Sequence, residues 1–453
     1  MGTLTPFTPD ARTRELLADA AEEVGRVTDG RIGDLVGRAL LATLTETVGV
    51  DPAGRVFVIT GDIPAMWLRD STTQLTPYLR FVEQSGQLAD LVEQVVRRQF
   101  GFIAHDPYAN AFNDGPTGAH YDPEDVCEDP AVWEQKYEVD SLAYPVTLAH
   151  ALWRKTGRTG FLLDAPAPEV LRTVVDQLRA EQQHDTSPYR FERTTTIPTE
   201  TLSSGGRGSP VAETGMTWSA FRPSDDACTY GYNIPANLFA AEALLALAEI
   251  AAEVLDDATL ADDARALSAE LVAGVHAHGI VPGPGGVPIY AYEVDGLGGS
   301  LIMDDANTPS LLSLPLIAPT VLDPAVWATT RDVVLSPANP YWFEGSVLRG
   351  VGSPHTRDRR VWPIALAVEG LVGTPADRRR LLRMIADTDA GTGRVHESID
   401  VDDPAVFSRP WFSWAESMFC ELALTVVDDE RSRPTRFDRR GLPDDSAALR
   451  VGD

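Results

Sequence analysis

Two adjacent aspartates in the middle of the chain are candidates for acid–base chemistry. Asp225 and Asp226 lie in a segment, residues 214–232, that is rich in aromatic side chains. A carboxyl group that is held near aromatic rings and near a second carboxylate has a raised pKa, which a general acid needs at neutral pH. The structural alternative is that Ser224 and Asp225 cap a helix that follows them.

Glu397 is a candidate for the matching general base. It follows His396 and precedes a segment, residues 408–414, that contains arginine, tryptophan and phenylalanine. A carboxylate beside polar and charged neighbours stays ionised, and one that lies opposite the acid can activate a water molecule for attack on an anomeric carbon. The structural alternatives are an ion pair between Glu397 and an arginine, and a hydrogen-bonding role for His396 within the fold.

A third cluster near the N-terminal end of the chain has the composition of a sugar-binding loop. It contains Asp62, Trp67, Arg69 and Asp70. Carboxylates and guanidinium groups form bidentate hydrogen bonds with vicinal hydroxyls, and an indole face stacks on the apolar face of a pyranose. The alternative is that Asp70 or Ser71 caps a helix while the tryptophan lies in the core.

Weaker signals lie elsewhere in the chain. Three segments could line further subsites or only stabilise loops: residues 136–140, 303–309 and 339–343. His276 and His278 are separated by one residue, but no third ligand is near them in the sequence. We therefore expect these histidines at the surface and predict no metal site.

Charge and cysteine content exclude several classes of function. The formal net charge is −29 at pH 7, which repels nucleic acid and anionic lipid but not neutral sugars. Cys127, Cys228 and Cys420 are far apart, so we expect buried free thiols rather than a zinc site or a disulfide, and no cofactor. The first residues lack a basic and then apolar leader, and no apolar stretch approaches the length of a membrane span. These features predict a cytoplasmic protein without a membrane partner.

About a dozen helices must position the candidate residues. Apolar positions at helical spacing predict helices over residues 10–27, 32–48, 71–82, 88–104, 140–155, 168–183, 235–255, 260–277, 324–335, 360–372, 375–386 and 410–427. Long irregular loops separate them at residues 107–135, 184–229 and 279–309, and a turn at residues 283–286 predicts a small hairpin. Few other segments resemble strands. The pattern predicts an all-α fold, an (α/α)6 toroid with long active-site loops at one face, formed by a single domain over residues 1–430. We expect residues 431–453 to form a charged C-terminal tail.

The three clusters together resemble a known family, glycoside hydrolase family 125, whose members are exo-α-1,6-mannosidases. The resemblance rests on residues 61–71, 221–227, 396–398 and 409–412, which occur in the family's order and span most of the chain. It implies an (α/α)6 toroid and the metal-independent, inverting hydrolysis of a terminal α-1,6-linked mannose in an oligosaccharide. It assigns the base to Glu397 and the acid to Asp225 or Asp226, without deciding between these two. It further implies sugar-binding roles for a wider set: Asp62, Trp67, Arg69, Asp70, Trp218, Arg222, Asp304, Asp305, Asn307, His396 and Arg409.

Three other functions fit parts of the pattern. A magnesium-dependent terpene synthase or prenyltransferase is helical and uses aspartate pairs, but its D-D-x-x-D motif would need an acid where this chain has Thr229. A non-catalytic mannoside-binding toroid would keep the aromatic side chains without needing two carboxylates for acid and base roles. A related toroidal glycosidase that acts on another sugar is the third possibility.

Overall fold

Fifteen α-helices are the main regular elements of the chain described by the computed structural model, which covers residues 4–123 and 125–432. Five of them are mostly buried and contact one another in a row. α13 packs against α15, α15 against α3, α3 against α5, and α5 against α9. These inner helices are α3 (Leu68–Thr73), α5 (Val139–Thr156), α9 (Ile234–Glu253), α13 (Pro363–Leu371) and α15 (Ser413–Arg431).

The outer helices alternate with the inner ones along the chain. They bury one face and expose the other, as expected for amphipathic segments. They are α2 (Gly30–Ala42), α4 (Gly86–His105), α7 (Ala167–Ala180), α10 (Ala258–Gly274), α12 (Pro324–Val334) and α14 (Pro375–Ala386), and α1 (Ala11–Val27) packs on α2 and α15. Three short helices complete the set: α6 (Gly160–Leu163), α8 (Ser203–Gly206) and α11 (Leu314–Ile317). Alternating inner and outer helices are the arrangement of the predicted toroid.

α9 is a long and mostly apolar helix. By length and mean hydropathy, 1.5 over its best window, it could cross a membrane, but 78% of that window is buried inside the protein. Asn233 starts the helix by accepting a hydrogen bond from the backbone N–H of Ala236 at 3.0 Å. The helix is therefore apolar on all sides because it lies in the inner layer between α5 and α10.

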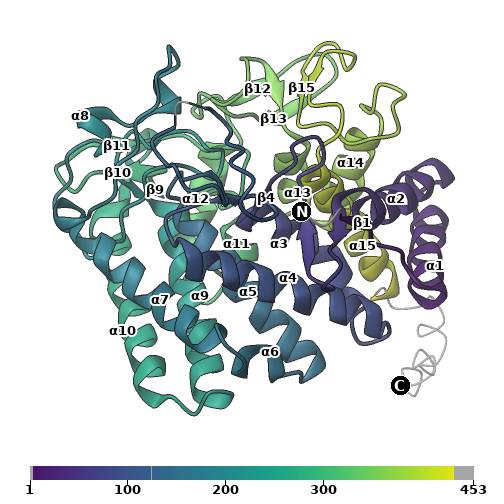
Figure 1. Cartoon of the computed structure of the whole chain (residues 1–453). Coiled ribbons are helices and arrows are strands. Elements are labelled where there is room, and N and C mark those ends of the chain that lie inside the picture. The colour runs from purple at the N-terminus through teal and green to yellow at the C-terminus, as the bar shows by residue number, and fades with distance from the viewer. Residues whose placement is uncertain (1–3, 124, 433–453) are drawn as a thin grey trace, which may run out of the picture.

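Short antiparallel strands connect the helices and form small sheets. In Figure 1, β10–β13 and β15 lie along the upper edge of the view, above the long helices. Two three-stranded sheets carry candidate residues: β4 (Met66–Trp67), β5 (Ala111–Phe112) and β6 (Val132–Glu134), and β14 (Arg360–Val361), β15 (Ser398–Asp400) and β16 (Phe407–Ser408). The other strands are β1 (Thr5–Pro6), β2 (Val48–Val50), β3 (Val56–Val58), β7 (Tyr232–Asn233), β8 (Ile280–Pro282), β9 (Pro288–Tyr290), β10 (Glu293–Val294), β11 (Ser300–Leu301), β12 (Trp342–Glu344) and β13 (Arg349–Val351).

Several local predictions can be compared with the structure. The hairpin around residues 283–286 is confirmed by the pairing of β8 with β9. The single helix predicted over residues 71–82 is wrong, because α3 ends at Thr73 and a separate 3₁₀ helix, Thr76–Arg80, has as its second residue Pro77, which lacks the N–H needed to continue α3. His276 and His278 are exposed, as expected.

Two other predictions are corrected or lie outside the described residues. Only Cys420 among the three free thiols is buried, whereas Cys127 and Cys228 are half-buried. α15 continues to Arg431 and the description ends at residue 432, so the predicted tail lies almost entirely outside it.

Candidate active site

One pocket collects half of the catalytic and sugar-binding residues that the sequence singled out. Among its lining are seven of the predicted catalytic and sugar-binding residues: Trp67, Arg69, Asp70, Asp225, Asn307, Glu397 and Arg409. The remaining lining residues are Thr60, Ile63, Pro223, Ser224, His355, Trp362, Phe412 and Trp414. Segments that are hundreds of residues apart therefore meet at a single pocket lined by carboxylates, arginines and aromatic rings.

The start of α3 positions the first cluster. Trp67 pairs with Ala111 across β4 and β5 and serves as the N-cap residue, so Arg69 and Asp70 fall in the first helical turn. Asp70 therefore lies inside the helix, and the expectation that Asp70 or Ser71 caps it is wrong. Arg69 and Asp70 are only 3% and 4% exposed, so their charges interact with the pocket rather than with bulk water.

A tight turn separates the two adjacent aspartates. Asp225 has a left-handed backbone with φ of 67°, and the backbone N–H groups of Asp225 and Arg222 bond within the same turn. As a result, the Asp225 side chain is 24% exposed and lines the pocket, whereas Asp226 is 1% exposed and does not. No helix begins here, so capping by Ser224 and Asp225 is also wrong: α9 starts later, at Ile234.

Arg69 is the cation around which the pocket's carboxylates gather. Its guanidinium lies 2.6 Å from Glu138, 3.2 Å from Asp140, 3.3 Å from Asp225 and 3.4 Å from Asp70. Burial raises the pKa of Asp225, but the positive charge of Arg69 outweighs it together with other contacts, so the pKa of Asp225 lies below its ordinary value.

The other acids of this group have raised pKa values. Burial raises the pKa of Asp70 to about 6, against the opposing effect of Arg69. Burial likewise raises the pKa of Asp140 to about 6 and that of Glu138 well above its ordinary value. One guanidinium cannot neutralise four carboxylates, so protonation is easier on this side of the pocket than for free carboxyl groups.

Glu397 comes from a much later segment of the chain than Arg69 and Asp225, and it lies directly before β15. The Ser408 hydroxyl donates to its Oε2 at 2.8 Å, and Nη1 of Arg409 lies 3.4 Å from its Oε1. Arg409 also forms a bidentate ion pair with Asp62 and donates to the Thr60 hydroxyl at 3.1 Å. Arg409 thus bridges the first and last clusters, and the expected ion pair of Glu397 with an arginine is present.

His355 is a pocket residue that the sequence analysis missed. Its Nδ1 lies 3.1 Å from Oδ1 of Asp226, and its side chain is 29% exposed. Burial lowers the pKa of His355, but the hydrogen bond and charge of Asp226 raise it to about 9. No motif surrounds this histidine in the sequence, so only the fold reveals its partner. The missed aromatic residue Trp362 similarly follows β14 and has no flanking motif.

Two predicted sugar contacts need correction because their side chains are buried away from the pocket lining. Trp218 is 1% exposed and stacks on His184 with ring centroids 3.4 Å apart. Arg222 donates to Glu293 at 2.5 Å and to Thr229 at 3.2 Å. Both residues stabilise the long loop that carries Asp225.

Asp304 and Asp305, which are also predicted to contact the sugar, are buried and form hydrogen bonds with other protein groups. Asp304 is fully buried and accepts backbone hydrogen bonds from Leu311 and Leu312, and burial raises its pKa to about 8. Asp305 accepts from Ser224 at 2.9 Å and from the Asn307 amide at 3.1 Å, so it orients two pocket residues.

His396 also lies within the protein rather than in the pocket lining. Its Nδ1 lies 2.9 Å from the carbonyl oxygen of Pro410, and its ring stacks on Phe407. Asp62 is outside the lining too, but it holds Arg409 through the ion pair described above. The structural alternative considered for His396 therefore describes its contacts better than sugar binding.

Glu200, Asp226 and His355 are the described residues whose donor atoms lie close enough together, within 4.8 Å, to hold a metal ion. Glu200 already accepts from Lys136 at 3.2 Å and from Arg193 at 2.7 Å. Two adjacent cations and the bonded histidine make this a poor cation site. The donor set therefore does not fit a resident metal.

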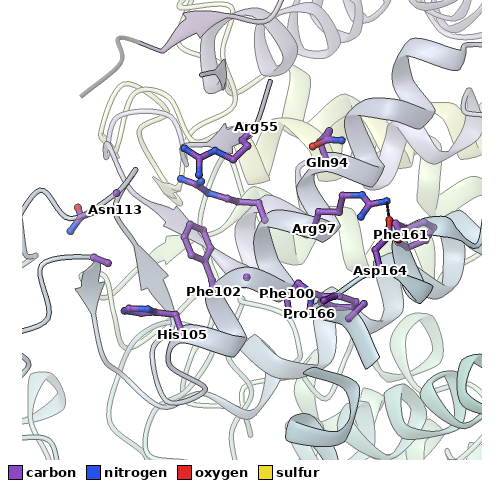
Figure 2. A pocket seen from close by; sticks show the side chains of 16 residues that line it. Arg55, Gln94, Arg97, Phe100, Phe102, His105, Asn113, Phe161, Asp164 and Pro166 are labelled. Carbon is purple, nitrogen blue, oxygen red and sulfur yellow. Dashed lines mark hydrogen bonds and ion pairs between the residues drawn. The ribbon is translucent and has the colours of Figure 1, made fainter. Parts of the chain in front are cut away.

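Another pocket lies beside α4 and is shown in Figure 2. Its charged side chains already have partners: Arg97 reaches Asp164, as the dashed line in Figure 2 marks, Arg55 pairs with Asp51 and Arg98 with Asp114. Asp164 is the carboxylate in its lining, and it belongs to an ion pair. This pocket lacks two opposed carboxyl groups, so we assign the chemistry to the pocket that contains Asp225 and Glu397.

Comparison with known protein structures supports the fold. A structure of a metal-independent α-mannosidase from Streptococcus pneumoniae, a non-productive complex with α-1,6-mannobiose, is 42% identical with a TM-score of 0.90, covering 93% of this chain and 99% of that chain. A glucoamylase from Saccharomycopsis fibuligera shares only the fold, with 11% identity and a TM-score of 0.51 over 94% of this chain and 98% of that chain. The predicted (α/α)6 fold class is thereby confirmed.

Sequence comparisons identify the family to which the chain belongs. The meiotically up-regulated gene 157 protein of Schizosaccharomyces pombe is 39% identical over 393 residues, which cover 83% of this chain and 77% of that protein. The family model of metal-independent α-mannosidases, GH125, matches residues 29–424. A prenyltransferase is therefore excluded. The chain belongs to the GH125 family of metal-independent α-mannosidases and is a glycoside hydrolase.

Proposed function

We propose that this protein is an exo-acting α-mannosidase that removes terminal α-1,6-linked mannose from oligosaccharides with inversion at the anomeric carbon. The observation that carries the proposal is that Asp225 and Glu397 line one pocket but share no hydrogen-bond partner among the described residues. Inversion requires room for a water molecule between the base and the anomeric carbon, so the proposal predicts that these two carboxyl groups lie about 6.5–9.5 Å apart. The α-1,6-mannobiose bound to the Streptococcus pneumoniae relative supports the choice of linkage.

Asp225 is the proposed general acid. It is the member of the aspartate pair that reaches the pocket, and the carboxyl groups around it have raised pKa values. In the reaction, Asp225 protonates the glycosidic oxygen as the bond to the anomeric carbon breaks. Asp226 has another role in this proposal: it orients His355, whose ring lines the same pocket.

Glu397 is the proposed general base. It takes a proton from a water molecule that attacks the opposite face of the sugar, while Ser408 and Arg409 fix its two oxygens. The rings of Trp67, Trp362 and Trp414 supply apolar walls against which a pyranose can stack. Asn307 and Asp70 offer an amide and a carboxyl group for its hydroxyls.

Proton NMR of a cleavage reaction tests the proposal directly. The purified protein is mixed separately with α-1,6-, α-1,2- and α-1,3-mannobiose, all with EDTA present. We expect β-mannose to appear first, and only from the 1,6-linked sugar. Early α-mannose would overturn inversion, cleavage of the other linkages would overturn the specificity, and tight binding without cleavage would favour a mannoside-binding protein. Cell fractionation tests the cytoplasmic location that the sequence predicts, and a secreted protein would contradict it.

A further inference from the structure

A second carboxyl group lies against the proposed general acid. Glu138 is the residue directly before α5 and is 1% exposed. Its Oε2 accepts from Arg69 at 2.6 Å and from the Ser141 hydroxyl at 3.1 Å, and its Oε1 accepts from the Asn110 amide at 3.3 Å. Glu138 does not line the pocket, so it can act there only through a neighbour.

That neighbour is Asp225, which uses the same two donors. Arg69 reaches it at 3.3 Å and the Asn110 amide at 3.4 Å. Because the two carboxyl groups bond to the same guanidinium and the same amide, they lie next to each other. Carboxylate oxygens are acceptors only, so a hydrogen bond between the two groups requires a proton on one of them. The pair resembles the shared-proton dyads of other hydrolases in its chemistry.

The surrounding charges favour keeping that proton. When the pair itself is counted, five carboxyl groups face three cations, and nearly all of these groups are buried. The groups that face the pair are the cations Arg69, Lys136 and His355, the acids Asp70, Glu134, Asp140, the thiol of Cys228 and the neutral donors Asn110 and Ser141. Ionising both members would place two more negative charges in this low-dielectric site.

We propose that Glu138 is a positioning residue that shares one proton with Asp225 and keeps it available for transfer to the glycosidic oxygen. This inference rests on the proposed role of Asp225. In each turnover the shared proton leaves Asp225 and bonds to the leaving oxygen, which takes the electron pair of the broken C–O bond. Water adds to the anomeric carbon and gives its proton to Glu397. Exchange with solvent then removes that proton from Glu397 and returns one to the Glu138–Asp225 pair.

The pH profile of Glu138→Gln tests the shared proton. A glutamine keeps the size of the side chain and can donate its amide N–H to Asp225, but it cannot hold the proton. Asp225 then titrates alone beside Arg69, so its ionised form is favoured. We expect the alkaline limb of kcat/KM to move to lower pH by about one unit or more, a loss of about tenfold at a pH above the new limb.

A purely structural role for Glu138 predicts a different result. It would lower kcat/KM at all pH values and leave the limb in place, and that outcome would overturn the inference. Glu181→Gln is the matched control, since Glu181 is fully buried and hydrogen-bonded to Tyr108 and Ser187 outside the pocket lining. Its limb should coincide with that of the wild type.

A second variant covers the case in which Glu138→Gln does not fold. Ser141→Ala removes a hydroxyl that donates to Glu138 and stabilises its ionised form. The pair should then hold its proton more tightly, so the alkaline limb should move to higher pH. A limb that stays where it is in the wild type would overturn the inference.

A substrate with a good leaving group separates this inference from the proposed function. An α-mannoside of dinitrophenol needs no proton on its leaving oxygen, so Asp225→Asn and Glu138→Gln should both cleave it at close to the wild-type rate. On α-1,6-mannobiose, Asp225→Asn should lose activity, whereas Glu138→Gln should lose it only above its shifted alkaline limb. If Asp225→Asn loses both substrates equally, Asp225 is not the acid and the proposed role fails. If Asp225→Asn behaves as expected but the limb of Glu138→Gln does not move, only the shared proton is refuted.

Discussion

Asp226 directs its carboxylate to His355, with 3.1 Å between Oδ1 and Nδ1, while its neighbour Asp225 faces the pocket. The two aspartates are adjacent in the chain, but the positive φ of Asp225 turns their side chains into different surroundings. One member of the pair is thus available to a substrate, and the other holds a cationic imidazole at the pocket wall.

The first prediction concerns the pH dependence of stability. The folded pKa of His355 is about 9, above its ordinary value of 6.5, because of Asp226. The stabilisation is therefore fully present below pH 6.5 and is lost as the pH rises through 9. We expect Asp226→Asn to lower the free energy of unfolding more below pH 6.5 than above pH 9. The difference between the two losses should be about 2–3 kcal/mol.

Denaturant unfolding of the wild type and Asp226→Asn across this pH range measures the effect. The same substitution in a His355→Phe background is the control, since no imidazole remains to titrate. A difference between wild type and Asp226→Asn that does not change with pH would contradict the ion pair.

The helical scaffold could be read from the sequence because its signals are local. The apolar positions of α9 and the proline-led starts of α12 and α14 lie within each segment, and each helix appears close to its predicted bounds. The strands could not be predicted in the same way. They are two or three residues long, which is too short for an alternating pattern, and some pair only where distant segments meet, as β7 does with β10 and β14 with β15. The β8–β9 hairpin is an exception, because its turn residues lie within one segment.

The site could be predicted only where its residues lie in recognisable motifs. Arg69, Asp225 and Glu397 each stand in a cluster of polar and aromatic residues, and the structure brings them to one pocket. His355 stands in no motif and Glu138 lies only in the weak signal of residues 136–140, and the roles of both depend on contacts across the fold, which a single sequence does not reveal. The choice between Asp225 and Asp226 likewise depends on the backbone φ of Asp225. Trp218 is of a residue type that often stacks on sugars, but in the structure its ring packs on His184.

The second prediction addresses the proposed base. Glu397→Gln keeps the shape of the side chain and can still accept from Ser408, but it cannot take a proton from water. We expect kcat on α-1,6-mannobiose to fall by about 10²–10⁴-fold, the contribution of a general base. Thermal unfolding should show a melting temperature near that of the wild type. Ordinary activity in a folded Glu397→Gln protein would remove Glu397 from this role.

The third prediction separates the two tryptophans that the sequence treats alike. Trp218→Ala should lower the free energy of unfolding by about 3–5 kcal/mol, because it empties a fully buried site, and should leave KM unchanged. Trp67→Ala should raise KM by about two- to tenfold, because a stacking surface worth about 0.5–1.5 kcal/mol is lost from the pocket.

Denaturant unfolding and initial-rate kinetics of both variants check this pair of expectations. Each variant serves as the control for the other, since both remove an indole that is at most 3% exposed. A KM that rises in Trp218→Ala and not in Trp67→Ala would reverse the assignment.

The fourth prediction is that removing divalent metal leaves the enzyme unchanged. Glu200, Asp226 and His355 have the spacing of a metal site, but Lys136 and Arg193 already neutralise Glu200 and would repel a divalent cation. After dialysis against EDTA we expect the same kcat and melting temperature as before, and no gain on adding calcium, zinc or magnesium. If EDTA instead abolished activity and one ion restored it, Glu200→Gln would locate that ion. Loss of the metal response in this variant would place the ion between Glu200, Asp226 and His355. It would also show that Lys136 and Arg193 do not exclude a divalent cation from that position.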